Sequence, residues 1–594
     1  MKQLSSANPE AKPLITSIIC LLITLFLLAR VAAAETQTPA DVIVIHARIY
    51  TVNAKQPWAE ALAVRGGRIT AVGTDTQIQA LCGPHTRTLD VQGHLVLPGF
   101  TDSHVHFLDG SLSLLQVNLD GLTTIPEIQE AVKAYAAAHP DAPWILGRGW
   151  SYPVFAPSGL PDRKYLDQVI PNRPVYLEGF DGHTWWANSM ALRLAGINRD
   201  TPNPPNGTIV RDSAGDATGA IQEDAADAVV RRAIPAPARE EKVRAFRAGM
   251  LEANRVGVVR IHSVGGVSMG NPDLGNVDLL EQLRGSGELT VRLYLAYRVD
   301  PPEITGRQLE QIEEAKKRYH DEWISAGAVK FFLDGVVESH TAAMLEPYSD
   351  DPSQVGKLFW DPEIYKKEVR ELDRRGLQIF THAIGTKAVR MALDAYQQAA
   401  ETNHTGDARH RIEHVETISA ADVPRFGKLG VIASMQPLHS YPDDDTLKIW
   451  ARNAGPDRAS RAWAWHSIHE HGGILSFGSD WPIVTLRPWP GVQTAVTRQT
   501  SDGKPPDGFV PQERLSLEDT IKAYTLGAAI AGRREKTEGS LEPGKLADLI
   551  VLSQDLFKIP PREIDKTEVM LTMVGGKVVY ESPAWKTVST TAGK

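Results

Sequence analysis

Short stretches in which hydrophobic and polar residues alternate occur near both ends of the chain. This alternation has the period of two that a half-buried β-strand requires. Paired glycines at Gly66-Gly67 and Gly575-Gly576 interrupt two of the stretches and predict tight turns. The strand-like stretches cover residues 41–51, 61–72, 88–97, 547–552 and 569–579. Because strands gather at both ends, we expect one small β-domain built from the two termini together.

The middle of the chain repeats a different arrangement, in which an apolar run leads to a residue able to bind a metal and then to a turn and an amphipathic helix. Residues 377–380 lead to His382, and a helix is expected from about 387 to 400. Two later apolar runs lead in the same way to His414 and to Asp480. Alternating strands and helices predict a parallel sheet, and a (β/α) barrel gathers its site at the C-terminal ends of its strands.

A stretch rich in Pro, Gly and Trp, from about 140 to 236, does not follow this repeat and is predicted to be an insertion near the barrel mouth. Before it, Thr124 and Glu127 have the spacing of a helix capping box, so we expect the first helix of the barrel region there. Aromatic residues of the insertion, among them Trp150, could line a substrate pocket or could instead form a core.

The N-terminus has the pattern of a secretory signal peptide. Lysines precede an apolar run at 14–29, and small residues occupy positions 32–34, so we expect cleavage after Ala34 and a periplasmic or secreted protein without stable membrane association. The alternative is an uncleaved membrane anchor. The run is shorter than the roughly 20 apolar residues that span a bilayer, which favours cleavage.

Length and charge restrict the possible functions. The 594 residues exceed the roughly 250 of a plain eight-stranded barrel, so an insertion or a second domain is required. The net charge of −9 is mild and no basic block is present, which argues against nucleic acid as a partner. A small-molecule substrate is expected, and oligomerisation stays open.

His104 and His106 lie two positions apart at the end of a predicted strand. Side chains at this spacing point the same way, so both imidazoles can bind one ion while Val105 packs backwards. Together with His382, His414 and Asp480, each at a predicted strand end, they form a nitrogen and oxygen ligand set suited to zinc or another divalent ion.

These residues lie within a series of motifs that covers nearly the whole mature chain. The motifs are Leu97-Pro98-Gly99-Phe100-Thr101-Asp102-Ser103-His104-Val105-His106, Trp144-Ile145-Leu146-Gly147-Arg148-Gly149-Trp150, Asp181-Gly182-His183-Thr184, Gly327-Ala328-Val329-Lys330-Phe331-Phe332-Leu333-Asp334-Gly335, Thr381-His382-Ala383, Ile412-Glu413-His414, Gly478-Ser479-Asp480-Trp481-Pro482 and Gly544-Lys545-Leu546-Ala547-Asp548-Leu549-Ile550-Val551-Leu552. The chain resembles the metal-dependent amidohydrolase superfamily, and specifically its long-chain amidohydrolase family 3 branch.

The resemblance implies an α/β fold. Its core would be a distorted (β/α)8 TIM barrel, with a small composite β-sandwich domain formed by both termini and an insertion near the barrel mouth. The corresponding boundaries are a signal peptide at 1–34, β-domain parts at 35–97 and 539–583, a barrel at 98–538 and a disordered tail at 584–594.

The resemblance also assigns roles at a metal site. It makes His104, His106, His382 and His414 ligands, and makes Asp480 both a ligand and the general base. One or two divalent ions are implied, with zinc first and manganese or iron as alternatives. The remaining ligand would be Lys330, placed on the fourth barrel strand and carbamylated so that its two oxygens bridge two ions. The alternative is that Lys330 pairs with Asp334 or Glu338.

The activity implied is hydrolysis of a C–N bond other than a peptide bond, in an amide, an N-acyl amino compound or a cyclic amide. Metal-bound hydroxide would attack the carbonyl carbon while Asp480 moves the proton, and His183 or His382 would help to stabilise the oxyanion. The substrate-binding candidates are Trp150, His183, His340 and His439. The alternatives are a heterocycle deaminase, an ester or carbamate hydrolase, and a non-catalytic binding or scaffold barrel.

Overall fold

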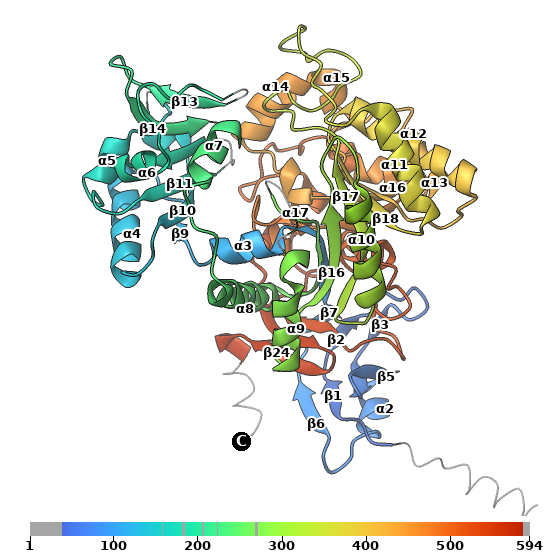
Figure 1. Ribbon diagram of the computed structural model, residues 1–594. Coiled ribbons are helices and arrows are strands. Elements are labelled where there is room, and N and C mark those ends of the chain that lie inside the picture. The colour runs from blue at the N-terminus through green and yellow to red at the C-terminus, as the bar shows by residue number, and fades with distance from the viewer. Residues whose placement is uncertain are drawn as a thin grey trace, which may run out of the picture.

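The computed structural model describes residues 38–585, apart from 157, 181–183, 205–206, 223, 268–270 and 272. The expected signal peptide at 1–34 and the end of the expected tail, from residue 586, lie outside the described residues. Figure 1 shows a central barrel, a second domain beside its mouth and a β-domain at its opposite end. Within the described part of the chain, no helix combines the length and apolar character needed to cross a membrane.

Eight parallel strands form the central sheet, and each pairs with the next in chain order. The strands are β8 (Phe100–Val105), β15 (Val258–Ser263), β16 (Arg292–Arg298), β17 (Ile324–Phe332), β18 (Gln378–Ala383), β19 (Arg411–His414), β20 (Ile432–Met435) and β21 (Ile474–Phe477). The segment after β21 closes the ring, since Trp481 bridges to Val105 and the N–H of Asp480 donates to the carbonyl of His104 at 2.7 Å. The predicted TIM barrel is therefore confirmed.

Most helices of the barrel region cover its outside between the strands, and two short ones, at 451–454 and 456–459, lie at the end away from the β-domain (Figure 1). The helices of this region are α3 (Phe107–Ser113), α8 (Arg239–Val256), α9 (Val277–Gly285), α10 (Gly306–Arg318), α11 (Pro362–Arg374), α12 (Thr386–Asn403), α13 (Val423–Leu429), α14 (Ala451–Ala454), α15 (Pro456–Ala459), α16 (Trp465–Glu470), α17 (Pro488–Thr497), α18 (Leu517–Lys522) and α19 (Ala528–Ala531). The predicted helix after His382 is α12, which buries an apolar face containing Val389 and Leu393. Burial of such faces, rather than helix propensity, supplies most of the stability of helices in proteins.

Both ends of the chain build the β-domain. One sheet has the order β5 (Arg68–Gly73), β4 (Ala61–Arg65), β1 (Val42–Ile45), β6 (Arg87–Asp90), with α2 (Asp75–Gln79) nearby, and the other has the order β24 (Lys577–Glu581), β23 (Val569–Val574), β22 (Leu549–Leu552), β7 (Leu95–Pro98), β2 (Arg48–Tyr50), β3 (Trp58–Ala59). Val96 of β7 pairs antiparallel with Val551 of β22. Side chains of the two sheets share one hydrophobic core, as a sandwich requires. Trp585, which falls within the expected tail at 584–594, also lies in this core and is 2 % exposed.

The inserted domain lies in the connection between the first two barrel strands. Its mixed sheet has the order β13 (Thr208–Arg211), β14 (Ala217–Gln222), β12 (Thr184–Ala187), β11 (Val175–Gly179), β10 (Ile145–Trp150), β9 (Val117–Asn118), and its helices are α4 (Ile125–Ala138), α5 (Arg163–Asp167), α6 (Ser189–Leu194) and α7 (Asp224–Arg231). The capping box at Thr124 is present. Helix α4 packs on β9 and β10, so in this structure it is part of the inserted domain.

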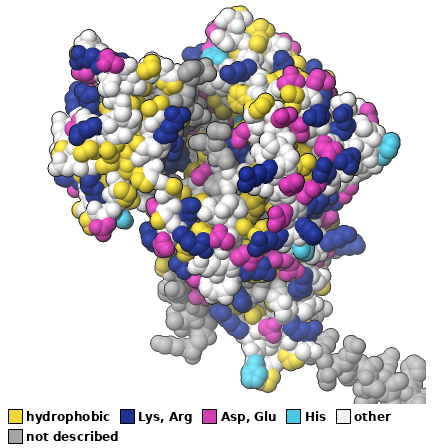
Figure 2. Space-filling view, viewed as in Figure 1, with side chains coloured by type: hydrophobic (Ala, Val, Ile, Leu, Met, Phe, Trp, Pro, Cys, Tyr) yellow, Lys and Arg dark blue, Asp and Glu magenta, His cyan; other side chains and the backbone are white. Residues whose placement is uncertain are grey.

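The inserted domain contacts the barrel close to the candidate site. Arg148 of β10 donates a hydrogen bond to the carbonyl of Pro482, two positions beyond Asp480. The space-filling view shows a hollow between the inserted domain and the barrel (Figure 2). On this face, basic and acidic side chains are interspersed rather than gathered into a single patch. The insertion therefore lies beside the barrel mouth, as its position in the sequence suggests.

Candidate metal centre

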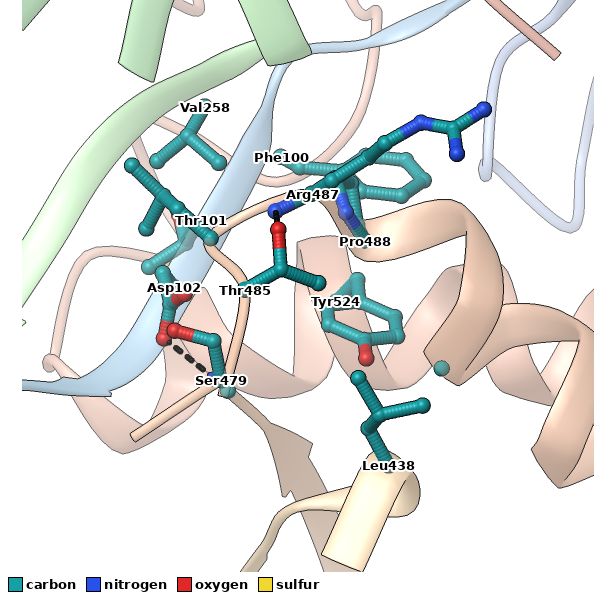
Figure 3. Close-up of a pocket in the computed structure, with 13 residues that line it drawn as sticks. Phe100, Thr101, Asp102, Val258, Leu438, Ser479, Thr485, Arg487, Pro488 and Tyr524 are labelled. Atoms are coloured by element: carbon teal, nitrogen blue, oxygen red, sulfur yellow. Dashed lines mark hydrogen bonds between the residues drawn. The ribbon is translucent and has the colours of Figure 1, made fainter. Parts of the chain in front are cut away.

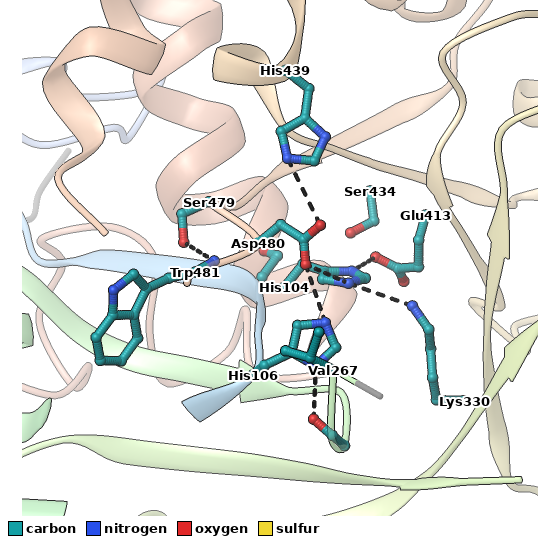
Figure 4. A network of polar contacts seen from close by, with 12 residues as sticks. His104, His106, Val267, Lys330, Glu413, Ser434, His439, Ser479, Asp480 and Trp481 are labelled. Atoms are coloured by element: carbon teal, nitrogen blue, oxygen red, sulfur yellow. Dashed lines mark hydrogen bonds and ion pairs between the residues drawn. The ribbon is translucent and has the colours of Figure 1, made fainter. Parts of the chain in front are cut away.

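His104 and His106 converge on one carboxylate oxygen. The Nε2 atoms of both imidazoles lie 3.3 Å from Oδ1 of Asp480, and all three side chains are buried (Figure 4). Val105 between them has no exposed surface and packs into a core outside the barrel, as the spacing predicts. The first and last barrel strands thus bring the three side chains together.

The protonation of the two imidazoles leaves both Nε2 atoms as acceptors. The Nδ1 of His104 lies 2.6 Å from a carboxylate oxygen of Glu413, and the Nδ1 of His106 lies 2.8 Å from the carbonyl of Gly265. Because these oxygens only accept hydrogen bonds, each Nδ1 carries the proton. Burial, and to a lesser degree Lys330, lower the pKa of His104 to about 4, which favours its neutral form. The lone pairs of both Nε2 atoms therefore face the negatively charged carboxylate of Asp480 and repel it. A cation between them would remove this repulsion.

The separation of these atoms fits a small divalent ion. Ligand atoms about 2.1 Å from a tetrahedral zinc ion lie roughly 3.4 Å apart. The two distances of 3.3 Å match this value. Oδ1 of Asp480 is buried and has no hydrogen-bond partner in the described structure, although buried polar atoms are nearly always paired. The donor set and the unpaired oxygen both fit a metal ion.

A second group of candidate ligands shares the same carboxylate. One ligand atom each of His414, His439 and Asp480 lie within 4.8 Å of one another. The rings of His414 and His439 are stacked, with centroids 5.8 Å apart, and the buried atoms Nδ1 of His414 and Nε2 of His439 lack hydrogen-bond partners among the described residues. Asp480 therefore lies between two clusters of nitrogen donors.

Two of the candidate ligands have an unusual backbone conformation. His414 and Asp480 have φ angles of 74° and 65°, in the left-handed region that residues other than glycine seldom occupy. Such conformations cost about 1 to 3 kcal/mol each and cluster at functional sites. His414 is the last residue of β19, and Asp480 lies three positions after the end of β21.

His382 lies at the same end of the barrel but belongs to neither group. Its ring is 4.5 Å from that of His414, and its Nε2 faces the carbonyl of Gly335 at 3.4 Å and the carboxylate of Asp334 at 3.6 Å. The ring nitrogen left to reach an ion is Nδ1. Burial first, and then the charge of Lys330, lower the pKa of His382 to about 3, so its ring is neutral.

Lys330 lies on β17, the fourth barrel strand, with its side chain entirely buried. Its Nζ lies 3.4 Å from Nε2 of His104. No ion pair joins Lys330 to Asp334 in the described structure, and the carboxylate of Asp334 instead accepts three backbone N–H groups. Burial lowers the pKa of Lys330 to about 7, because the acidic neighbours Glu413 and Asp480 only partly offset the loss of solvation.

His439 lies in the connection that follows β20, the seventh barrel strand, and faces Asp480. Its Nε2 lies 3.7 Å from Oδ2 of Asp480, and its Nδ1 lies 3.8 Å from Glu416, which accepts a hydrogen bond from the indole of Trp450 at 2.7 Å. Burial lowers the pKa of His439, but the nearby carboxylates of Glu416 and Asp480 outweigh it and raise the pKa overall. The structure thus brings this predicted substrate-binding residue to the candidate site.

The other predicted substrate-binding residues have different surroundings. Trp150 has no exposed surface, and its indole donates to the carbonyl of Leu177 within the core of the inserted domain. In this structure its ring fills that core. His340 contacts the carboxylate of Asp350 at 3.0 Å and the ring of Tyr348. His183 lies outside the described residues.

Sequence reasoning missed two acidic residues that orient the imidazoles. Glu413 contacts His104 and Glu416 contacts His439, and both carboxylates are buried. For Glu413 the available signal was an acidic residue inside a short strand, directly before a candidate ligand; Glu416 lies two positions after that strand ends. Partners of this kind fix the tautomer and direction of metal-binding histidines.

Comparison with known proteins gives consistent matches over most of the chain. Residues 87–580 match the profile described as "Amidohydrolase family". The protein LONG AFTER FAR-RED 3 of Arabidopsis thaliana is 34% identical over 546 residues, which is 91% of this chain and 92% of the relative. An N-substituted formamide deformylase of Arthrobacter pascens is 28% identical over 552 residues, which is 91% of this chain and 98% of the relative.

A solved structure has the same arrangement. The crystal structure of an uncharacterized metal-dependent hydrolase from Pyrococcus furiosus is similar with a TM-score of 0.68 and 25% sequence identity, and the match covers 87% of this chain and 100% of the other.

Proposed function

The chain belongs to the amidohydrolase family, and on this premise we propose that it is a metal-dependent hydrolase that cleaves a C–N bond other than a peptide bond, in an amide, an N-acyl amino compound or a cyclic amide. The observation that carries the proposal is the convergence of His104 and His106 on Oδ1 of Asp480 at 3.3 Å. One or two divalent ions would be held there, zinc first and manganese or iron as alternatives. A bound ion of this kind supplies a Lewis acid that activates water and polarises the scissile carbonyl.

Asp480 is the proposed general base. Its buried carboxylate faces the Nε2 atoms of His104 and His106, and a divalent cation bound between them would keep it ionised. An ionised carboxylate can take a proton from the attacking water and return it to the leaving nitrogen. Its second oxygen faces His439, which we propose as a substrate-binding residue. His183 or His382 is the proposed donor to the developing oxyanion, and His382 can take this role only if its Nδ1 carries a proton instead of binding an ion.

Lys330 is proposed to act as a carbamate. A neutral amine is the form that adds to CO2, with loss of one proton, and a lysine pKa of about 7 leaves much of this amine neutral at physiological pH. The product would place two oxygens beside His104 and toward His382 and His414, so that a second ion could bind. Without carbamylation, the site would hold a single ion.

The named relatives support the choice of substrate class. One of them is an N-substituted formamide deformylase, and this chain matches 98% of its length. We therefore place N-formyl and N-acyl amines first among substrates. A deaminase would instead release ammonia, and an esterase or carbamate hydrolase would release an alcohol. A non-catalytic barrel would require none of the candidate ligands, yet all five of His104, His106, His382, His414 and Asp480 are present.

Export is part of the proposal. The apolar run at 14–29 and the small residues before Glu35 support a signal peptide, with an uncleaved anchor as the alternative. N-terminal sequencing of protein from the cell envelope should begin at Glu35. An intact N-terminus in the membrane fraction would support the anchor.

The decisive test combines metal analysis with a substrate screen. Purified protein should contain one or two divalent ions per chain, and chelation should abolish hydrolysis of N-formyl amines, N-acyl amino acids or cyclic amides until zinc or manganese is restored. Full activity after removal of the metal would refute the metal-dependent mechanism. Metal-loaded protein that hydrolyses only esters would refute the assignment to C–N bonds.

A further inference from the structure

Arg411 and Glu413 form a buried pair directly beneath the candidate metal centre. Nε of Arg411 lies 2.9 Å from one carboxylate oxygen of Glu413, and Nη2 lies 3.0 Å from the other. The second of these oxygens also accepts the hydrogen bond from Nδ1 of His104 at 2.6 Å (Figure 4). Both Arg411 and Glu413 have no exposed surface, so water cannot substitute for either partner.

The same guanidinium reaches the backbone next to His104. Nη2 of Arg411 donates to the carbonyl of Ser103 at 2.5 Å and to the hydroxyl of Ser434 at 2.8 Å. Its remaining nitrogen, Nη1, lies 3.0 Å from Nδ1 of His262, and its planar group lies over the ring of Phe380 at 3.8 Å. The position of the guanidinium is therefore fixed on all sides.

These contacts act on His104 from two directions. The carboxylate of Glu413 fixes the tautomer and the direction of the ring, while the bond to Ser103 fixes the backbone from which the side chain projects. Arg411 supports both, because it holds Glu413 in a bidentate geometry that a lysine could not reproduce. Glu413 is also the residue before His414, so the pair is connected to a second candidate ligand.

We propose that Arg411 and Glu413 are positioning residues that set the affinity of the metal centre by holding His104 in its ligating orientation. The proposal rests on the proposed function, since it presumes that His104 binds the ion. Carboxylate partners of ligating histidines commonly contribute 10- to 100-fold to metal affinity.

A second buried ion pair in the barrel provides a matched control. Arg260 binds Glu538 through Nε at 2.5 Å and through Nη2 at 2.7 Å, and both side chains are almost fully buried. Within the described residues, no hydrogen bond or ion pair joins this pair to a candidate ligand. It has the same chemistry and burial as Arg411 and Glu413, so substitutions in it report the general cost of disturbing a buried ion pair.

The experiment compares Arg411→Lys and Glu413→Gln with Arg260→Lys and Glu538→Gln. For each protein, zinc affinity is measured by competition with a coloured chelator, the visible spectrum is recorded with Co²⁺ in place of zinc, and thermal unfolding is measured without metal. We expect the first two variants to bind zinc about 10- to 100-fold more weakly and to have an altered cobalt spectrum. The two controls should lose thermal stability while retaining the affinity and the spectrum.

The outcomes separate the two levels of the proposal. Wild-type protein that binds none of zinc, manganese and iron would refute the proposed function itself. Wild-type zinc affinity in both Arg411→Lys and Glu413→Gln would refute the positioning role while leaving the metal site intact. Equal losses of zinc affinity in Arg260→Lys and Glu538→Gln would also refute the positioning role. If Arg411→Lys does not fold, Glu413→Gln decides, because it keeps the volume and one acceptor oxygen while it removes the charge and replaces the second acceptor with an N–H donor.

Discussion

The carboxylate of Asp102 accepts a hydrogen bond from the backbone N–H of Ser479 at 2.9 Å (Figure 3). The same oxygen accepts the N–H of His104 at 3.2 Å. One buried side chain thus joins the first barrel strand to the segment after the last one, next to two candidate ligands. The approach is so close that a Cβ atom at Gly478 would lie 2.6 Å from this oxygen. Only glycine fits there.

Asp102→Ala should destabilise the protein, because it leaves the buried N–H groups of His104 and Ser479 without an acceptor. At about 1 to 3 kcal/mol for each unpaired group, we expect a loss of roughly 3 kcal/mol in the free energy of unfolding. Asp102→Asn keeps an acceptor oxygen and should lose much less. Denaturant unfolding of metal-free protein measures the free energy of unfolding of both variants. Equal stability of Asp102→Ala and the wild type would show that these two hydrogen bonds do not stabilise the protein.

Asp480→Asn should retain the fold and much of the metal, but lower turnover by about 10²-fold or more, since the proton acceptor is lost while a neutral oxygen of similar size remains. The measurement is kcat at equal metal content. Near-normal turnover in the loaded variant would exclude Asp480 as the base.

Lys330→Ala distinguishes a carbamate from an uncharged amine or an ion pair. If the lysine is carbamylated, the variant should lose the second ion and most of its activity, and acetate or propionate should partly restore both by filling the vacated space. Metal content and rate are measured with and without the carboxylate. Full metal content and full rate in the variant would reduce the site to a single ion without a carbamate.

His439→Asn should lower kcat/KM by about tenfold or more, since the imidazole is held between Glu416 and Asp480, where a bound substrate would lie. His340→Asn is the comparison, because His340 contacts Asp350 instead and its loss should affect kcat/KM less. Steady-state kinetics on one substrate is sufficient. A larger loss of kcat/KM in His340→Asn than in His439→Asn would indicate that His340, and not His439, contacts the substrate.

Asp273 should make stability depend on pH. Burial raises its pKa from 3.8 to about 7, although the hydroxyl of Ser263 and the N–H of Leu108 act in the opposite direction. The folded protein therefore holds this proton more tightly than the unfolded chain does. Its contribution to stability is complete below pH 3.8 and is lost as the pH rises to about 7.

Asp273→Asn tests this directly, because an amide has no proton to lose in this range. In metal-free protein, the melting temperature of the wild type should fall relative to that of the variant as the pH rises from about 4 to 7. A difference in melting temperature that stays constant over this range would show that Asp273 is not protonated in the folded protein.

The periodicity of the sequence determined the barrel and the composite β-domain, because strand and helix faces must alternate with their own periods in order to bury apolar side chains. It also placed His104, His106, His414 and Asp480 at strand ends. These are local properties, since the i, i+2 geometry of a strand depends only on neighbouring residues. The sequence did not determine where the insertion begins, because the capped helix α4 has the same pattern whether it packs on the barrel or on the inserted sheet.

Only the tertiary structure decided which side chains meet. Glu413 turns toward His104 rather than toward the ligand next to it, Trp150 packs in the core of the inserted domain, and His439 rather than His340 reaches Asp480. Each of these outcomes depends on strands far apart in the chain being brought together by barrel closure. A sequence states which residue types are available at strand ends, but the distances that decide between ligand, partner and core residue arise only when the ring of strands closes.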